Sequence, residues 1–160
     1  VYADAQAAWT YMVEQKGIDP KAIFIYGHSL GGAVAIQLAL NNPAAGGLIV
    51  EAAFTSIADM ARRIPKYRIF PLELIVQERF ESIEKVGRLQ APVLYIHGTD
   101  DKLVPPEMSS ELYKRTASSK QLKLIPGGGH NNSASVGGDE YLQAVKNFID
   151  FARKAIRQSI

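Results

Sequence analysis

The sequence of 160 residues contains no cysteine. This absence excludes disulfide bonds and thiolate metal sites, although it does not identify the compartment in which the protein works. The three histidines are scattered along the chain, so we expect neither a metal nor a cofactor. A run of about 18 or more apolar residues is also missing, and we therefore expect no membrane span within this chain.

An excess of charge of either sign is lacking as well. The 18 lysines and arginines nearly balance the 16 aspartates and glutamates, which leaves a net charge of +2 without a basic block. Nucleic acid is therefore not an expected partner. Apolar residues make up 47% of the chain and charged residues 21%, which is typical of a globular protein. The length favours a single domain over residues 1–160.

Short apolar runs alternate with segments of helical spacing. Apolar runs without alternation are typical of strands that are buried on both faces. We expect strands at residues 22–26, 47–51, 91–97 and 121–126, and helices at residues 2–16, 31–41, 107–117 and 139–158. This order indicates the α/β class, with a mostly parallel sheet that has helices on both faces.

Residues 52–90 do not follow this alternation. The segment reads as short helical pieces that are broken by Pro65 and Pro71. A small helical cap that binds an acyl chain and ordinary core packing against the sheet are both open readings. The apolar side chains that would serve either role are Ile64, Tyr67, Ile69, Phe70, Leu72, Leu74, Ile75 and Phe80.

The stretch Gly27-His28-Ser29-Leu30-Gly31 places a serine between two glycines, where a strand is expected to turn into a helix. In this setting the pattern G-x-S-x-G indicates a nucleophile elbow, a strained turn that projects the serine above the sheet. We expect tight packing to leave no room for a side chain at either glycine. The N–H of Leu30 is the expected oxyanion donor, because it lies in the first turn of the helix.

A serine hydroxyl is a weak nucleophile and needs an adjacent base. We predict that His130 is this base, because its glycine-rich loop GGGHNNSASVGG follows the fourth strand and is expected to be flexible enough to reach the sheet edge. His97 ends a strand and is expected to position a loop. His28 is expected to pack beside Ser29, where it is a candidate substrate contact.

The base in turn needs a carboxylate that holds its tautomer and stabilises the imidazolium. Asp100 and Asp101 both follow the third strand, and the carboxyl ends of parallel strands share one edge of the sheet. We therefore expect the acid, Ser29 and His130 to meet at that edge. Phe54 follows the second strand and is a further candidate substrate contact.

Taken in order, three motifs resemble the α/β-hydrolase family. GHSLGG is similar to its nucleophile elbow, APVLYIHGTDDKLVPP to its acid-bearing strand and loop, and IPGGGHNNS to its histidine loop. Alignment of Gly98 and Val104 with the family pattern places the acid at Asp101 rather than Asp100. More narrowly, EAAFTSIADMA and EYLQAVKNFI resemble single-domain serine hydrolases that include palmitoyl-protein thioesterases, with esterase-like and peptidase-like branches. The resemblance implies cleavage of an ester, thioester or amide in a small-molecule or acylated substrate.

The resemblance covers essentially the whole chain but only the C-terminal half of the family fold. Upstream of Ser29 we find no counterpart of the strands that normally precede the nucleophile, one of which carries the loop with the second oxyanion N–H. We therefore expect the first strand to have a bare outer edge and the chain to be a fragment that begins partway through a longer enzyme. Anchoring through a missing N-terminal segment leaves cytoplasmic and membrane-associated locations open. The alternative function is a non-catalytic interaction module with the same fold.

Overall fold

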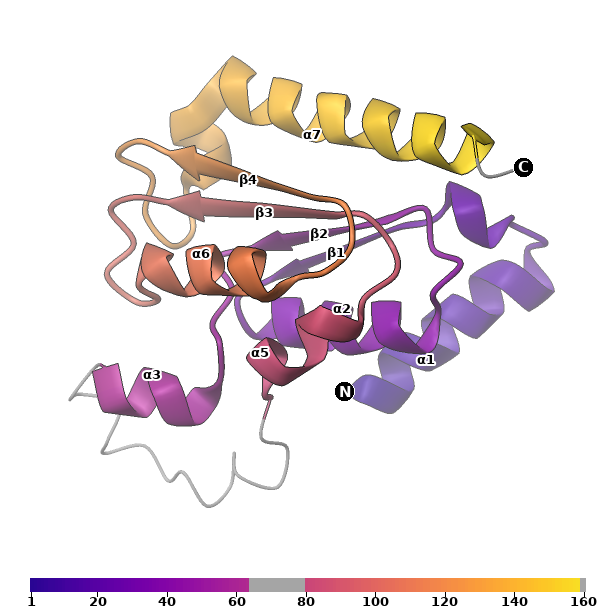
Figure 1. The fold of residues 1–160 in the computed structure, drawn as a ribbon, viewed down its shortest axis with the longest axis horizontal. Coiled ribbons are helices and arrows are strands. Elements are labelled where there is room, and N and C mark those ends of the chain that lie inside the picture. The colour runs from indigo at the N-terminus through magenta and orange to yellow at the C-terminus, as the bar shows by residue number, and fades with distance from the viewer. Residues whose placement is uncertain (64–79, 159–160) are drawn as a thin grey trace.

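A four-stranded parallel sheet forms the centre of the protein, whose computed structural model describes residues 1–63 and 80–158. The strands β1 (Phe24–His28), β2 (Gly47–Glu51), β3 (Val93–Gly98) and β4 (Lys120–Ile125) lie side by side in chain order. All four arrows in Figure 1 point the same way, so the loops that follow the strands gather at one edge of the sheet. The sequence predicts each strand close to its observed place.

Helices occupy the expected connections between the strands. The first, α1 (Tyr2–Thr10), continues as a π-helical turn (Tyr11–Gln15) and stops before Gly17, whose φ of +65° suits glycine. The other helices of the described residues are α2 (Leu30–Asn41), α3 (Ile57–Arg63), α5 (Ser82–Lys85), α6 (Pro106–Arg115) and α7 (Ser133–Gln158), with 3-10 turns at Pro20–Ala22 and Val86–Arg88.

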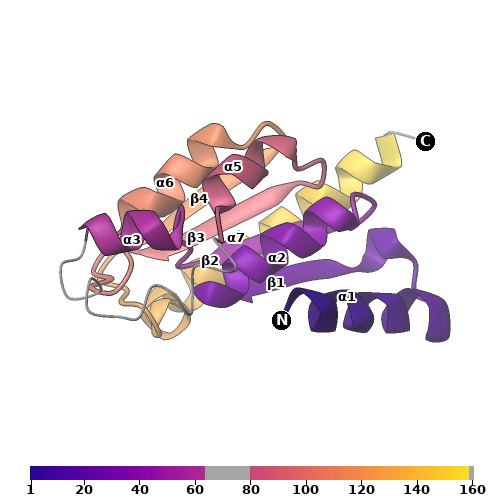
Figure 2. The same cartoon turned by 90° about the horizontal axis from the view of Figure 1, so that it is seen from below.

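Helices cover both faces of the sheet, as the apolar strands predict. Figures 1 and 2 show α7 on one face and α2, α5 and α6 on the other, with α1 packed against α2. The core on the α2 face includes Trp9, Ile36, Leu48, Tyr95 and Leu112, and the core on the α7 face includes Ile49, Leu94, Ile96, Ile125 and Phe148. A sheet that is covered on both faces explains why its strands are continuous apolar runs.

Helical structure begins before the predicted last helix. The glycine-rich sequence indicates a flexible loop through residue 138, but α7 starts at Ser133 with a short helical segment. Gly138, whose φ and ψ of 47° and −124° are not helical, interrupts α7, and the second part of α7 covers the predicted range 139–158. The N–H of Val136 donates to the carbonyl of Asn132 at 2.9 Å, which closes the first helical turn, and Ser133 is buried. The loop that carries His130 is therefore shorter and more firmly held than predicted.

Part of the predicted cap lies outside the described residues. Of its apolar side chains, Ile64, Tyr67, Ile69, Phe70, Leu72, Leu74 and Ile75 fall in residues 64–79, which the structure does not describe. Phe80 is described, and it is buried against the ring of Tyr2 with 5.6 Å between the ring centroids. That single position favours core packing over an exposed acyl-binding surface, and the cap as a whole stays a prediction.

The first strand, β1, lies at one end of the sheet. It pairs with β2 alone among the described strands, and the Tyr26 side chain at this border is 55% exposed. This position agrees with the bare outer edge that the sequence predicts for it. Within residues 1–63 and 80–158, no helix has the length and apolar character that crossing a bilayer requires.

Candidate active site

Ser29 lies on the sharp turn between β1 and α2. Its φ and ψ of 53° and −121° are strained for a residue with a side chain, and its N–H donates to the carbonyl of Glu51 at 2.9 Å. A Cβ atom at Gly27 would collide with the carbonyl oxygen of Gly31 and would lie 2.6 Å from Cβ of Ala35. The first glycine of the motif is therefore required because helix α2 packs directly on the end of β1.

The second glycine of the motif has a different environment from the one predicted. A Cβ atom at Gly31 would meet nothing within 4 Å, so crowding does not explain this glycine. The tight position is Gly32, where an added Cβ would lie 3.1 Å from Cγ1 of Val50 and 3.4 Å from Cβ of Ala53. The helix turns Gly31 away from the sheet and Gly32 toward it, and the sequence pattern does not reveal which of the two is packed.

The predicted serine, histidine and aspartate converge at the carboxyl edge of the sheet. The Nε2 atom of His130 lies 3.0 Å from Oγ of Ser29, and its Nδ1 atom lies 2.7 Å from Oδ2 of Asp101. Because a carboxylate only accepts hydrogen bonds, Nδ1 carries the proton and Nε2 is left to accept from the serine hydroxyl. The arrangement can therefore move a proton from Ser29 to His130.

Asp101 is buried and accepts four hydrogen bonds. Its Oδ1 atom receives the N–H groups of Leu103 and Val104 at 2.8 and 2.9 Å, and its Oδ2 atom receives His97 Nε2 at 3.1 Å as well as His130. Burial by itself raises the pKa of Asp101, but these donors outweigh burial and hold the pKa well below its ordinary value. Asp101 is therefore an ionised carboxylate at neutral pH.

The loops that carry the acid and the base are joined through their backbones. The N–H of Asp100 donates to the carbonyl of Gly128 at 2.8 Å, and the N–H of Gly127 donates to Oγ1 of Thr99 at 2.9 Å. A Cβ atom at Gly98 would collide with the carbonyl oxygen of Gly128. Sequence reasoning used Gly98 only to align a motif, and the structure gives its physical reason, which is close contact between the two loops.

The histidine loop is held from two sides. On one side, the Oδ1 atom of Asn132 accepts the N–H of Gly129 at 2.6 Å, and the hydroxyl of Ser133 donates to the carbonyl of Gly129 at 3.1 Å. On the other, His28 Nε2 donates to the carbonyl of His130 at 2.7 Å, and the two rings lie 4.9 Å apart. His28 therefore contacts His130, the predicted base, and Asn132 is a residue that supports this loop and that sequence reasoning missed.

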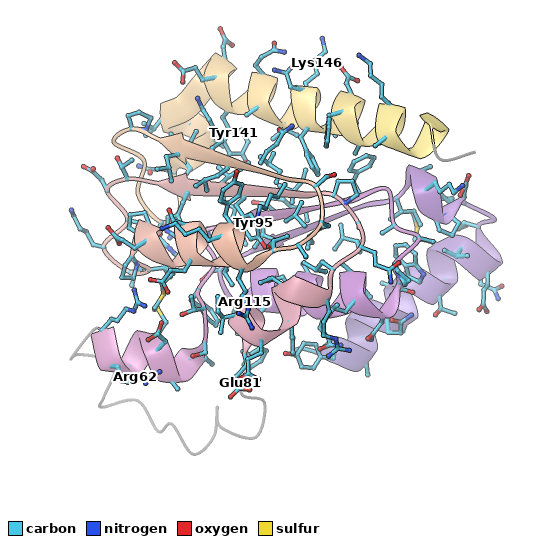
Figure 3. The ribbon with its side chains drawn as sticks, viewed as in Figure 1. Arg62, Glu81, Tyr95, Arg115, Tyr141 and Lys146 are labelled. Atoms are coloured by element: carbon cyan, nitrogen blue, oxygen red, sulfur yellow. The ribbon has the colours of Figure 1, made fainter. Side chains whose placement is uncertain are left out.

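Glu51 is the last residue of β2, beside the elbow, and its carboxylate accepts hydrogen bonds from two tyrosines. The hydroxyls of Tyr26 and Tyr141 each donate to its Oε2 atom at 2.8 Å, and Figure 3 shows Tyr141 approaching from α7. Burial raises the pKa of Tyr26 to about 12, and the Glu51 carboxylate shifts that pKa in the same direction. Burial and Glu51 also raise the pKa of Tyr141. This cluster supports the turn structurally, because the backbone of Glu51 accepts from Ser29.

The other two predicted site residues differ in exposure. Phe54 is 7% exposed and packs in an apolar cluster with Phe80, Val104 and Met108, which leaves little of its ring for a substrate. Leu30 begins α2 and its side chain is 47% exposed beside Ser29. The N–H of Leu30 is at the first residue of α2, where the helix offers no carbonyl one turn earlier to accept it.

The described residues do not form a set of side chains that could bind a metal ion. In the part of the chain that the structure describes, no group of three or more histidine, aspartate or glutamate side chains is placed to hold a metal ion. The side chains of His97, His130 and Asp101 instead form hydrogen bonds among themselves, with serine hydroxyls and with the backbone of residues 103 and 104.

The parallel sheet with helices on both faces has the α/β-hydrolase fold. Among solved structures, the chain matches the acetyl xylan esterase from Paenibacillus sp. R4 with a TM-score of 0.73. The match covers 93% of this chain and 51% of the esterase at 20% sequence identity, which shows a shared fold.

The sequence comparisons place the chain within one family. The model of the prolyl oligopeptidase family matches residues 1–159, and the chain belongs to this family. It is 36% identical over 147 residues to an uncharacterised protein of Mycobacterium tuberculosis, covering 92% of this chain and 51% of that protein. It is 33% identical over 165 residues to the alpha/beta hydrolase domain-containing protein WAV2 of Arabidopsis thaliana, covering 94% and 54%. The chain thus spans about half the length of these curated relatives.

Proposed function

We propose that this chain carries the catalytic triad of a serine hydrolase. Ser29 is the nucleophile, His130 the general base and acid, and Asp101 the residue that orients His130. The observation that supports this assignment is the unbroken chain of contacts from Ser29 Oγ to His130 Nε2 at 3.0 Å and from His130 Nδ1 to Asp101 Oδ2 at 2.7 Å.

The reaction proceeds by acyl transfer in two steps. The Oγ atom of Ser29 forms a bond to the substrate carbonyl carbon while His130 takes the hydroxyl proton. As the bond to the leaving group breaks, His130 returns the proton to that group, and an acyl-enzyme remains on Ser29. Water then attacks the acyl carbon with His130 as its base, which releases the carboxylic acid and restores the serine.

The developing oxyanion lies at the N-terminus of α2. The N–H of Leu30 is one donor for it, and the dipole of the twelve-residue helix favours negative charge at the same place. Under this proposal, Gly27 and Gly31 shape the elbow, and Phe54 and His28 border the substrate without being its main binding groups. The substrate is a small or acylated molecule with an ester, thioester or amide carbonyl.

Covalent labelling of the complete gene product tests the triad. A fluorophosphonate probe is expected to label the wild-type protein, and mass spectrometry should find the adduct on Ser29. Ser29→Ala and His130→Ala should abolish labelling while circular dichroism shows a retained fold. Ser110→Ala, which changes a serine on α6 outside the triad, is the matched control and should label like wild type.

Failure of the folded wild-type protein to label would reject the catalytic proposal and favour the non-catalytic interaction module. If labelling is found, turnover of matched acetyl ester, acetyl thioester and acetyl amide substrates separates the three carbonyl classes. Equal loss of all three activities in Ser29→Ala would assign them to one site.

A further inference from the structure

A second histidine lies behind the acid of the proposed triad. His97 is fully buried at the end of β3, and its Nε2 atom lies 3.1 Å from Oδ2 of Asp101 and 3.0 Å from the carbonyl oxygen of Val104. Its other ring nitrogen, Nδ1, lies 2.6 Å from Oγ of Ser109 on α6. His97 therefore contacts the same carboxylate oxygen as the catalytic base, from the interior side.

The neighbours of His97 define its protonation. Both groups near Nε2 are acceptors, so Nε2 carries a proton and donates. The hydroxyl of Ser109 is 2.6 Å from Nδ1 and 3.5 Å from the carbonyl of Ala53, so its proton points to the nearer acceptor, Nδ1. The ring is then neutral, and Ser109 fixes the tautomer that donates to Asp101.

The result is a chain of five side chains with Asp101 at its centre, running from Ser109 through His97 to Asp101 and on through His130 to Ser29. The two arms use the same residue types but differ in access to solvent. Ser109 and His97 have no exposed surface, whereas His130 and Ser29 are partly exposed at the sheet edge. The inner arm therefore cannot reach a substrate, and its effect has to pass through Asp101.

We propose that His97, with its tautomer fixed by Ser109, is a positioning residue for the acyl transfer described above, and this inference rests on that proposed function. Rotation about the last bond of an aspartate side chain has broad preferences, so the carboxylate needs partners to fix its plane. Two backbone N–H groups hold Oδ1. His97 holds Oδ2 from behind, so the carboxylate stays aligned with Nδ1 of His130 while that histidine gains and loses its charge.

Substitution of His97 tests this role. His97→Phe keeps a ring of similar size but removes the donor, and kcat and the rate of fluorophosphonate labelling are expected to fall roughly 10- to 100-fold, with KM little changed. His97→Gln restores an N–H donor that reaches toward Asp101 and should recover most of that loss. Ser109→Ala should lower these rates less, because the tautomer of His97 is then no longer fixed. Ser110→Ala on the same helix should not change them.

A double variant distinguishes positioning from a general structural effect. If His97 acts through the acid, adding His97→Phe to Asp101→Asn should slow labelling no further than Asp101→Asn alone. Additive losses, or wild-type kinetics in a folded His97→Phe protein, would overturn the inference while leaving the triad intact. A wild-type protein that does not label would instead overturn both this inference and the proposed function.

Nuclear magnetic resonance provides a readout that does not depend on whether His97→Phe folds. In the wild-type protein, the ¹⁵N shifts of His97 should report a neutral ring with the proton on Nε2. Ser109→Ala should introduce a fraction of the other tautomer, whereas Ser110→Ala should not. A charged His97 ring, or a proton on Nδ1 in the wild-type protein, would contradict the proposal.

Discussion

Asp101 and Ser29 lie on opposite sides of His130, each within hydrogen-bond distance of its ring, but the protein surrounds them differently. The carboxylate of Asp101 follows an inner strand, has no exposed surface and accepts two backbone and two side-chain donors. Ser29 follows the border strand β1, next to the exposed side chains of Leu30 and Tyr26. The acid end of the site is therefore built into the core, whereas the nucleophile end lies near open surface.

Under the proposed function, this difference separates two kinds of contribution to catalysis. The acid end would orient the ring of His130 through the hydrogen bond from its Nδ1 to Asp101. The nucleophile end would supply the reactive oxygen and one oxyanion donor. Substitution of Asp101 should therefore lower both stability and activity, while substitution of Ser29 should lower activity alone.

The largest effects are expected from substitution of Asp101 and of Ser29, one residue at each end of the site. Asp101→Asn should lower kcat/KM roughly 10⁴-fold, because the amide no longer holds the tautomer of His130. It should also lower the free energy of unfolding by about 1–3 kcal/mol, because buried donors lose a charged acceptor. Ser29→Ala should abolish turnover but change the free energy of unfolding by less than about 0.5 kcal/mol. Urea unfolding and steady-state kinetics measure both, and equal stability losses in the two variants would contradict the comparison.

A change at the contact between the acid and histidine loops should have the next largest effect. Gly98→Ala forces a methyl group against the backbone of Gly128 and should lower the free energy of unfolding by about 1–3 kcal/mol. Turnover should fall as well, since both loops must shift. The matched control is Gly31→Ala, where the added methyl group meets nothing within 4 Å and should raise stability by roughly 0.5–1 kcal/mol. A destabilised Gly31→Ala variant would show that the elbow glycine is packed after all.

Gly98 and Gly31 also show which features of the structure can be predicted from the sequence. Apolar runs predict the four strands because a sheet covered on both faces needs apolar residues at every position. The convergence of Ser29, Asp101 and His130 is predictable because parallel strands bring their following loops to one edge. These inferences depend on chemical type and on order along the chain, which the sequence contains in full.

What the sequence does not contain is how residues from different loops pack against one another. Contact between the backbones of Gly98 and Gly128 joins positions 30 residues apart, and neither glycine differs locally from one in an ordinary turn. The sequence did not reveal the helical segment that begins at Ser133, because this segment consists of small residues that are equally common in loops. The contact between His97 and Ser109 could not be predicted either, because Ser109 lies on a separate helix.

A smaller effect is expected at the exposed border of the sheet. Tyr26→Phe removes one of the two hydroxyls that bind Glu51 and should lower the free energy of unfolding by about 1 kcal/mol, with turnover unchanged. Turnover should persist because Ser29 is held by the backbone of Glu51 rather than by its carboxylate. Tyr11→Phe, which also changes an exposed tyrosine, is the control and should leave stability unchanged. Loss of turnover in Tyr26→Phe would show that the Glu51 cluster belongs to the catalytic end of the site.

The smallest effect that we expect is a difference in pH dependence between wild type and Asp101→Asn. The pKa of Asp101 in the folded protein lies below its ordinary value of 3.8, so folding favours the ionised carboxylate. Its contribution to stability is complete above that ordinary value and is lost as the pH falls through the lower, folded-state pKa. The wild-type protein should therefore lose its stability advantage over Asp101→Asn as the pH is lowered. Urea unfolding in steps from about pH 6 to about pH 2 measures this convergence. Parallel curves for the two proteins would mean that the carboxylate is not held as a buried anion, and the acid end of the site would then be no more firmly built than the nucleophile end.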